Sequence, residues 1–381
     1  MTAGQPRKVK HVAALDGIRG IAILMVLAHQ LILDGVPQTL FWRLLLVPLQ
    51  AGWVGVQLFF VLSGFLITRI LGTTRGSENY WQSFYMRRAL RIFPLYYLLL
   101  AVMFWGVTRL DVTPPGFVVP PEDRVWFWTY LSNWGTLFGA ESGVLGHCWS
   151  LAVEEQFYLV WPFIVRWLDD RRLARLCGGL ALGVFLLRVV ALASGVAPDD
   201  IYTNTLTRLD ALALGSLAAV VDIGETNVAW FERVKRQWPV LVLSVVVIGV
   251  LSGGFSRVNP VTLSVGHSVL ALTFAMALCV LTEQERRGAQ TRWARPLCNP
   301  LLGLFGKHSY AIYLIHLPIH VWFSWAWLEH LVGQAPPLGV AAIQVGYWLV
   351  GPLALLALAR LIYAVVEGPI LGLKRHFAVR V

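Results

Sequence analysis

Apolar runs of about 20 residues recur along the whole chain, and they are the feature that most constrains its fold. A membrane-spanning helix needs about 20 predominantly apolar residues, because lipid offers no partner to an unsatisfied backbone polar group. Such runs occur at residues 14–34, 53–71, 92–110, 149–167, 176–194, 205–222, 238–256, 262–282, 300–327 and 339–366. The chain is 57% hydrophobic and only 14% charged, whereas soluble proteins are about a quarter charged. The sequence therefore predicts an all-α polytopic membrane protein with a bundle of about ten transmembrane helices.

The distribution of basic residues favours an orientation with both termini in the cytoplasm. If the N-terminus lies inside, the inner segments hold clusters of Lys and Arg, at residues 7–10, 69–91, 166–175, 233–236, 286–307 and 374–380. The Trp-rich stretch 124–139 is only about 16 residues long, which is typical of an interfacial or re-entrant helix. An eleventh span there would place the 166–175 cluster outside, against the positive-inside rule. We expect cytoplasmic tails at residues 1–12 and 373–381 and one transmembrane domain at 13–372.

The net charge of +10 does not indicate nucleic-acid binding. The basic residues lie in short clusters between apolar runs, and the sequence contains no compact basic domain that would hold a duplex. We therefore expect membrane lipid around the chain and no nucleic acid.

The first apolar run, "LDGIRGIAILMVLAHQ", contains Arg19 and His29. Ionisable groups inside a membrane are costly, so each is a candidate functional residue. Arg19 is also compatible with an interfacial anchor whose charged head reaches the membrane surface, and His29 with a packing contact to a neighbouring helix. The catalytic alternative is that His29 removes a proton from an alcohol, since histidine titrates near neutral pH.

Three arginines cluster in "FYMRRALRIFPLYY", where the chain re-enters the membrane from the cytoplasmic side. Arg87, Arg88 and Arg91 are compatible with ordinary positive-inside topology. They also suit a phosphate-binding rim, because guanidinium groups pair with phosphate oxygens in a bidentate manner.

Two adjacent carboxylates lie one turn into the run "WSLAVEEQFYLVWP". Glu154 and Glu155 point about 100° apart on a helix, whereas Ser150, Glu154, Tyr158 and Trp161 share one face. A carboxylate facing lipid is implausible. At least one of the two should meet an arginine, a histidine or a hydroxyl group, in a structural ion pair or in an acceptor site.

Two further spans carry polar residues. In "TLTRLDALALG", Arg208 and Asp210 are two positions apart and should contact other helices rather than each other. In "SYAIYLIHLPIH", the residues on one helical face are Ser309, Tyr313, His316 and His320. His316 and His320 have a usable spacing for a metal, but no further ligand set accompanies them, so we expect no metal site.

Together these motifs resemble the acyltransferase-3 family of integral-membrane O-acyltransferases. The segments that carry the resemblance follow one another along most of the chain: "LDGIRGIA", "FFVLSGFLIT", "FYMRRALRIFPLYY", "WSLAVEEQFYLVWP", "RLDALALG" and "SYAIYLIHLP". The resemblance implies a ten-helix domain that transfers an acyl group, commonly acetyl from acetyl-CoA, to a hydroxyl group. Some family members carry an added extracellular hydrolase-like domain, and we expect only the membrane domain within residues 1–381.

The resemblance also implies residue roles. The arginine and histidine of the first span, here Arg19 and His29, are the catalytic candidates, and Arg87, Arg88 and Arg91 are the donor-binding ones. The family places ten residues between that arginine and histidine, whereas nine separate them here, so Gln30 occupies the usual histidine position. On an ideal helix, this interval turns His29 about 80° away from Arg19.

We therefore expect a membrane O-acyltransferase of the cytoplasmic (inner) membrane that moves an acyl group, in particular acetyl, from acyl-CoA. The acceptor would be a hydroxyl of a sugar, a glycan or a glycosylated natural product, with no permanently bound cofactor. The expected acceptor or polar-cavity residues are Glu154, Glu155, Arg208, Asp210, Tyr313 and His316. The alternative is a transporter or flippase of a lipid-linked or secreted molecule, although the sequence lacks the repeated halves that many transporters show.

Overall fold

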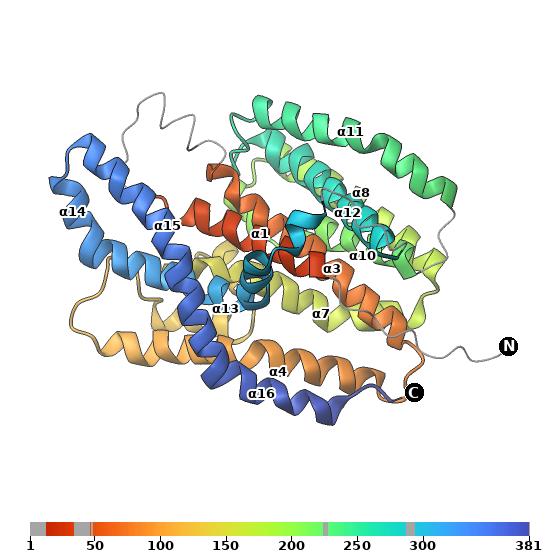
Figure 1. Cartoon of the computed structure of the whole chain (residues 1–381), viewed down its shortest axis with the longest axis horizontal. Helices are drawn as coiled ribbons and strands as arrows, with labels where there is room; N and C mark the ends of the chain where they lie inside the picture. Colours follow the sequence, from red (N-terminus) through yellow and green to blue (C-terminus); the bar gives the residue numbers. More distant parts are fainter. Residues whose placement is uncertain (1–12, 34–45, 47–48, 224–227, 287–293, 381) are drawn as a thin grey trace.

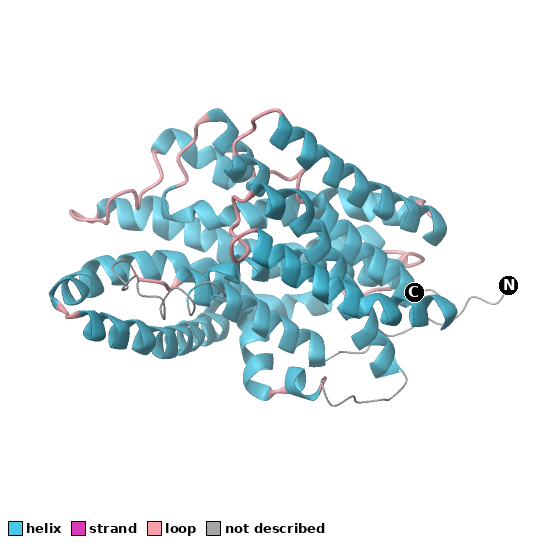
Figure 2. Cartoon of the chain, turned by 90° about the horizontal axis from the view of Figure 1, so that it is seen from above, coloured by secondary structure: helices cyan, strands magenta, loops and turns pink. Residues whose placement is uncertain are grey.

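The structure, a computed structural model, describes residues 13–33, 46, 49–223, 228–286 and 294–380. All regular secondary structure within these ranges is helical (Figure 2). The longer helices are α1 (Ala13–Gln30), α3 (Val54–Thr74), α4 (Tyr80–Ala101), α7 (Trp149–Trp167), α8 (Asp170–Ala193), α10 (Leu209–Ile223), α11 (Val228–Leu251), α12 (His267–Arg286), α13 (Pro300–Phe323) and α15 (Pro337–Ile362). The shorter ones are α5 (Arg124–Trp128), α6 (Ser132–Gly135), α9 (Pro198–Thr203), α14 (Glu329–Gln334) and α16 (Gly368–Gly372).

Each of the ten apolar runs contains a helix. Seven helical stretches of the described chain are long and apolar enough to cross a membrane: Ala13–Gln30, Ala51–Thr74, Tyr80–Arg109, Asp170–Ala193, Thr262–Arg286, Pro300–Gln334 and Pro337–Phe377. The other three runs correspond to α7, α10 and α11. Helix α7 carries two glutamates and an arginine, α10 has only 15 residues, and the apolar part of α11 is the short stretch Arg236–Leu251. The all-helical class is therefore confirmed, with seven candidate membrane-spanning helices in the described chain, and the count of ten spans stays a prediction.

The stretch 124–139 forms no continuous helix. Helices α5 and α6 are separated by a turn in which Tyr130 has a φ of 55°, a left-handed conformation that is uncommon for a residue with a side chain. This segment packs against α4, because the Tyr96 hydroxyl donates to the Phe127 carbonyl at 2.9 Å and the Tyr96 ring stacks on that of Tyr130.

Glycines hold the central helices close together. Helices α1 and α13 pack along their length, as do α3 and α10 (Figure 1). A Cβ atom on Gly20 would overlap the backbone of Leu302, and one on Gly215 would overlap the carbonyl of Val61. Small residues at such contacts let membrane helices approach closely. These contacts fix the depth at which the polar residues of α1 and α3 lie.

Ion pairs mark the two ends of the bundle. At one end, the carboxylate of Asp222 on α10 accepts from Arg69 of α3 at 3.1 Å and from Arg286 of α12 at 2.6 Å. We call this end, to which the predicted inner clusters around residues 69 and 286 belong, the basic end. At the opposite end, Arg257 pairs with Asp199 at 3.2 Å.

Capping residues set where the helices begin at the basic end. Asp169 caps α8: its carboxylate accepts from the backbone N–H of Arg172 at 2.8 Å, and this bond holds the pKa of Asp169 below its usual value. Asn299 caps α13 in the same way through the N–H of Leu301. Such caps satisfy N–H groups that have no partner within the helix.

The C-terminal segment lies against α4. Helix α16 continues into a helical turn, Leu373–Phe377, which packs on α4. The Asn79 amide donates to the carbonyl of Ala378 at 2.8 Å, and Figure 1 shows the C-terminus beside the start of α4. The predicted tail at 373–381 is therefore packed on the bundle through Arg380, whereas the predicted tail at 1–12 lies outside the described residues.

We predict that Gly215→Ala destabilises the protein. The new methyl group would overlap the α3 backbone, and overpacking of this kind costs about 1–3 kcal/mol. The melting temperature of the detergent-solubilised protein measures the effect. The control is Gly178→Ala on α8, because nothing lies within 4 Å of a Cβ at that position, and it should be neutral or slightly stabilising. Equal melting temperatures for the two variants would contradict the close-packing interpretation.

Candidate functional site

A cavity of about 90 Å³ lies where α1, α3, α4, α7 and α13 meet. Its charged lining residues come from three helices: Arg19 from α1, Arg88 and Arg91 from α4, and Glu154 and Glu155 from α7. Three guanidinium groups therefore face two carboxylates within the bundle. Asp16 also acts on Arg19 electrostatically, and the guanidinium groups that line the cavity suit the binding of an anionic group.

Helix packing places Arg19 in this cavity. Gly17 and Gly20 lie on the face of α1 that contacts the backbone around α13, which leaves Arg19 on the neighbouring face, at the cavity wall. Arg88 and Arg91 are close enough to act on Arg19 electrostatically. The two segments that the sequence separates by about 70 residues thus contribute to one positively charged surface.

A carboxylate and a hydroxyl of α7 form a hydrogen-bonded chain with a hydroxyl of α3. Ser150, Glu154 and Tyr158 lie on one face, as predicted, and all three line the cavity. The Tyr158 hydroxyl donates to Oε2 of Glu154 at 3.2 Å and forms a second, short hydrogen bond with Oγ of Ser63 on α3. The guanidinium of Arg88 lies over the Tyr158 ring, 4.8 Å from its centroid.

Tyr313 of α13 lines another part of the cavity wall. Its hydroxyl lies 2.6 Å from Oγ of Ser150 and also donates to the carbonyl of His147 at 3.1 Å. His316, one turn further along α13, is fully buried and does not line the cavity. Its Nδ1 bonds to the Tyr313 carbonyl at 2.6 Å, and its ring packs edge-on against that of His147. His316 therefore holds the backbone at Tyr313 without lining the cavity itself.

The donor-binding candidates divide between the cavity and the surface. Arg88 and Arg91 line the cavity, whereas Arg87 is exposed. Lys374, in the C-terminal turn, interacts electrostatically with all three arginines. These four residues form a cationic rim at the basic end, with the Glu367 carboxylate close to Arg91 and Lys374.

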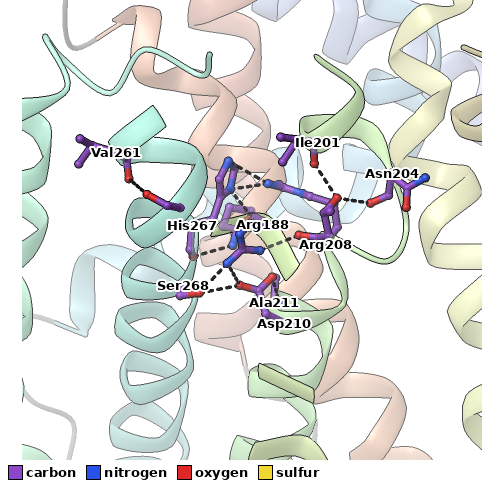
Figure 3. Close-up of polar contacts among 12 residues, drawn as sticks. Arg188, Ile201, Asn204, Arg208, Asp210, Ala211, Val261, His267 and Ser268 are labelled. Carbon is purple, nitrogen blue, oxygen red and sulfur yellow. Dashed lines mark hydrogen bonds and ion pairs between the residues drawn. The ribbon is translucent and has the colours of Figure 1, made fainter. Parts of the chain in front are cut away.

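Asp210 belongs to a separate buried ion pair. Figure 3 shows its carboxylate facing the guanidinium of Arg188 on α8, with Nη2 of Arg188 at 2.7 Å from Oδ2. Ser268 of α12 donates to the same oxygen at 3.0 Å, and Nη1 of Arg188 donates to the Thr207 carbonyl at 2.6 Å. Both charged side chains are almost completely buried and neither lines the cavity. This pair joins α8, α10 and α12.

The guanidinium of Arg208 lies among aromatic rings next to the Arg188–Asp210 ion pair. Its Nη1 forms a short hydrogen bond with His267 (Figure 3). Its guanidinium carbon lies 5.0 Å from the ring centroid of Tyr202, 5.4 Å from that of Phe60 and 5.6 Å from that of Trp149. Arg208 and Asp210 bond to other helices rather than to each other, as their two-residue spacing predicted, and α12 contributes a partner to both.

His29 lies at the opposite end of α1 from the cavity. It is ten residues beyond Arg19, about 15 Å along the helix, and is not among the lining residues. A Cβ atom built on Gly52 would approach its Cβ at 2.8 Å. Since Val56 lines the cavity, His29 lies about one helical turn beyond the cavity's end. Its Nδ1 is buried and has no hydrogen-bond partner within the described part of the chain.

Sequence reasoning gave little or no weight to four residues of these sites. No local motif singles out Ser63, because its contact with Tyr158 joins residues 95 positions apart. Lys374 lay in a predicted tail. Arg188 and His267 lie in apolar runs, and the cost of an ionisable group there was the signal that could have found them. The described residues contain no group of three or more His, Cys, Asp or Glu that could hold a metal ion.

Comparisons with known proteins show similarity to acyltransferases. A family model described as an acyltransferase domain matches residues 12–364. The chain is 26% identical over 327 residues to the peptidoglycan O-acetyltransferase OatA of Listeria monocytogenes, covering 81% of this chain and 49% of that protein. It is 26% identical over 393 residues to the O-acetyltransferase OatA of Staphylococcus aureus, covering 95% and 57%. The chain spans about half the length of these curated relatives. No solved structure matches it.

We predict that Arg188→Met destabilises the protein strongly. The substitution leaves the Asp210 carboxylate buried without its cation, and breaking a buried pair costs about 3–5 kcal/mol. The melting temperature in detergent should fall sharply, and adding Asp210→Asn should recover part of the loss. The control is Arg257→Ala: its pair with Asp199 is largely exposed, and such pairs contribute about 0–1 kcal/mol. A similar melting temperature for both single variants would rule out a structural role for the buried pair.

Proposed function

From the premise that the chain belongs to the acyltransferase-3 family, we propose that it is a membrane O-acyltransferase that moves an acetyl group from acyl-CoA to a hydroxyl of a glycan. Two relatives are named O-acetyltransferases, one of them a peptidoglycan O-acetyltransferase. These names support acetyl as the group and a sugar hydroxyl as the acceptor class, whether in a glycan or in a glycosylated natural product. The CoA thioester is a co-substrate rather than a bound cofactor.

The observation that carries this proposal is the cavity itself. It holds three guanidinium groups beside a carboxylate that is hydrogen-bonded to a tyrosine, and that tyrosine is in turn hydrogen-bonded to a serine. Acyl transfer develops negative charge on the carbonyl oxygen of the donor, and fixed cations and donors stabilise that charge. It also requires a group that takes the proton of the attacking hydroxyl. The cavity supplies both kinds of group.

The donor would enter from the basic end. The rim of Arg87, Arg88, Arg91 and Lys374 presents four cations to the phosphate groups of acyl-CoA, and guanidinium groups bind phosphate strongly. The pantetheine arm would then extend between the helices and place the thioester near Arg19. In this arrangement Arg19, together with the Tyr313 hydroxyl, stabilises the oxyanion.

The acceptor would enter from the other end. His29 lies about one helical turn beyond the cavity, and its buried Nδ1 has no hydrogen-bond partner among the described residues. We assign it the role of base for the acceptor hydroxyl. This role requires the acceptor to reach past Gly52 toward the cavity. Glu154 and Glu155 of α7 would then face the acceptor. Arg208 and Asp210, which do not line the cavity, would stabilise the helices around it.

The proposal includes an orientation in the membrane. Helices α7, α10 and α11 would complete ten spans, with both termini in the cytoplasm and the protein in the cytoplasmic (inner) membrane. The basic residues at the ends of α3 and α12, and at the starts of α4 and α8, lie where the positive-inside rule requires them.

We predict that the purified protein transfers label from [14C]acetyl-CoA to glycan hydroxyls, and that His29→Ala abolishes transfer while the melting temperature stays unchanged. Loss of the base removes a contribution of about 100-fold or more. The matched control, Gln30→Ala, should retain activity. Transfer to no acceptor, together with counterflow of a lipid-linked sugar in liposomes, would favour a transporter instead.

We also predict that Arg87→Ala and Lys374→Ala raise the donor KM with little change in kcat, because both side chains are on the rim and outside the cavity. Losing one charge-assisted bond to phosphate corresponds to about a tenfold increase in KM. Initial rates over a range of acetyl-CoA concentrations, repeated at higher salt, measure it. The control is Arg171→Ala, which removes an exposed cation at the same end. Equal donor KM values for the three variants would contradict the role of the rim in donor binding.

A further inference from the structure

Ser63 is a cavity serine whose hydroxyl is linked to a carboxylate through a tyrosine. It is only 8% exposed and lines the cavity from α3. Its Oγ forms a short hydrogen bond with the Tyr158 hydroxyl, which in turn donates to Oε2 of Glu154 at 3.2 Å. Because Tyr158 donates to the carboxylate, its own oxygen is free to accept the proton of Ser63.

Other hydroxyl groups of the cavity are differently connected. Ser150 donates to the carbonyl of His147 at 3.3 Å, and Tyr310 donates to the carbonyl of Ile92 at 2.6 Å. A backbone carbonyl does not take up a proton at ordinary pH, so these two groups have no route for proton release through those bonds. The chain from Ser63 through Tyr158 to Glu154 provides one.

The backbone around Ser63 is held in place. The adjacent Gly64 packs against the Leu212 carbonyl, and the Ser216 hydroxyl donates to the Gly64 carbonyl at 3.3 Å. Arg88, over the Tyr158 ring at 4.8 Å, favours negative charge on that ring as the proton moves. A nucleophile, a proton relay and a carboxylate in fixed contact are the parts of an activated serine.

We propose that Ser63 carries the acetyl group as a covalent intermediate. This inference rests on the proposed function and names a residue of its mechanism. Oγ of Ser63 attacks the thioester carbonyl of acetyl-CoA, while its proton passes to Tyr158 and the Tyr158 proton passes to Glu154. The tetrahedral oxyanion lies among the guanidinium groups of Arg19, Arg88 and Arg91. When it collapses, the C–S bond breaks and the CoA thiolate leaves, taking the proton from Glu154 through the relay.

The second half of the reaction returns the site to its starting state. The acceptor hydroxyl attacks the acetyl carbonyl on Ser63, the new C–O bond forms and the ester bond to Oγ breaks. The proton that His29, as the proposed base, takes from the acceptor is relayed by solvent to Glu154 and returned through Tyr158 to the serine alkoxide, so one proton leaves the acceptor and one returns to Ser63. No oxidant, reductant or further reactant is needed.

A two-step route also keeps the donor and the acceptor apart, because they need not occupy the cavity at the same time. An acetyl group held on Ser63 lets the donor leave toward the rim before the acceptor arrives.

The test is to incubate the purified chain with [14C]acetyl-CoA without acceptor, quench it with acid and map the label by peptide mass spectrometry. One acetyl group per chain is expected on Ser63, and addition of acceptor should discharge it. Ser63→Ala should lose both the label and transfer. Ser83→Ala, which removes a buried serine of α4 outside the cavity that bonds the Tyr80 carbonyl, should retain both.

Two further variants keep the result interpretable if Ser63→Ala fails to fold. Ser63→Cys should be labelled as a thioester, which neutral hydroxylamine cleaves faster than an oxygen ester. Tyr158→Phe should slow labelling about 100-fold, because it removes the proton relay, and should leave the melting temperature close to that of the unsubstituted protein.

Three results would overturn this inference: label on a residue other than Ser63, label that persists in Ser63→Ala, or transfer by the unsubstituted protein with no labelled chain after rapid quenching. In each of them acetyl-CoA still donates, so the proposed function survives. Absence of both label and transfer, with any acceptor, would instead overturn the proposed function and this inference with it.

Discussion

The structure depends on how charged side chains are accommodated inside a membrane-spanning bundle. A buried guanidinium or carboxylate needs a counter-charge or a full set of hydrogen bonds, and this chain meets that need in two ways. Arg188 and Asp210 pair with each other and bond to their neighbours, and neither lines the cavity at Arg19. Arg19 and Arg88, by contrast, share a cavity with glutamates in which cations outnumber anions. The first arrangement stabilises the bundle, and the second remains open to an anionic ligand.

Close packing decides which residues reach the cavity. Glycine contacts hold α1 against α13 and α3 against α10, so Arg19 and Ser63 have fixed depths within the bundle. Helices α7 and α13 then place their polar faces toward the same space through Glu154 and Tyr313. A catalytic constellation needs this rigidity, because its donors must already point at the developing charge.

The helices and about half of the site could be predicted from the sequence. Apolar runs fix where helices form, and the cost of charge in lipid identified Arg19, Glu154 and Arg88, which the cavity brings together. The same signal also identified Asp210 and His316, which have structural contacts instead. Helical phase shows which face a residue occupies, but not which helix that face meets. Ser63 could not be identified from the sequence. Its link to Glu154 runs through Tyr158 on another helix, and only the packing of α3 against α7 creates it.

The positions of the rim, the cavity and His29 suggest why a membrane enzyme would divide the reaction. The cationic rim lies at the basic end, His29 lies about one helical turn beyond the other end of the cavity, and α1 connects them. A CoA molecule carries several phosphate charges and is costly to move through lipid, whereas an acetyl group is small and uncharged. Transferring the acetyl group to a side chain within the bundle leaves the charged carrier on its own side. The electrostatic cost is then confined to the rim, where cations already offset it, and the acceptor meets only a neutral ester.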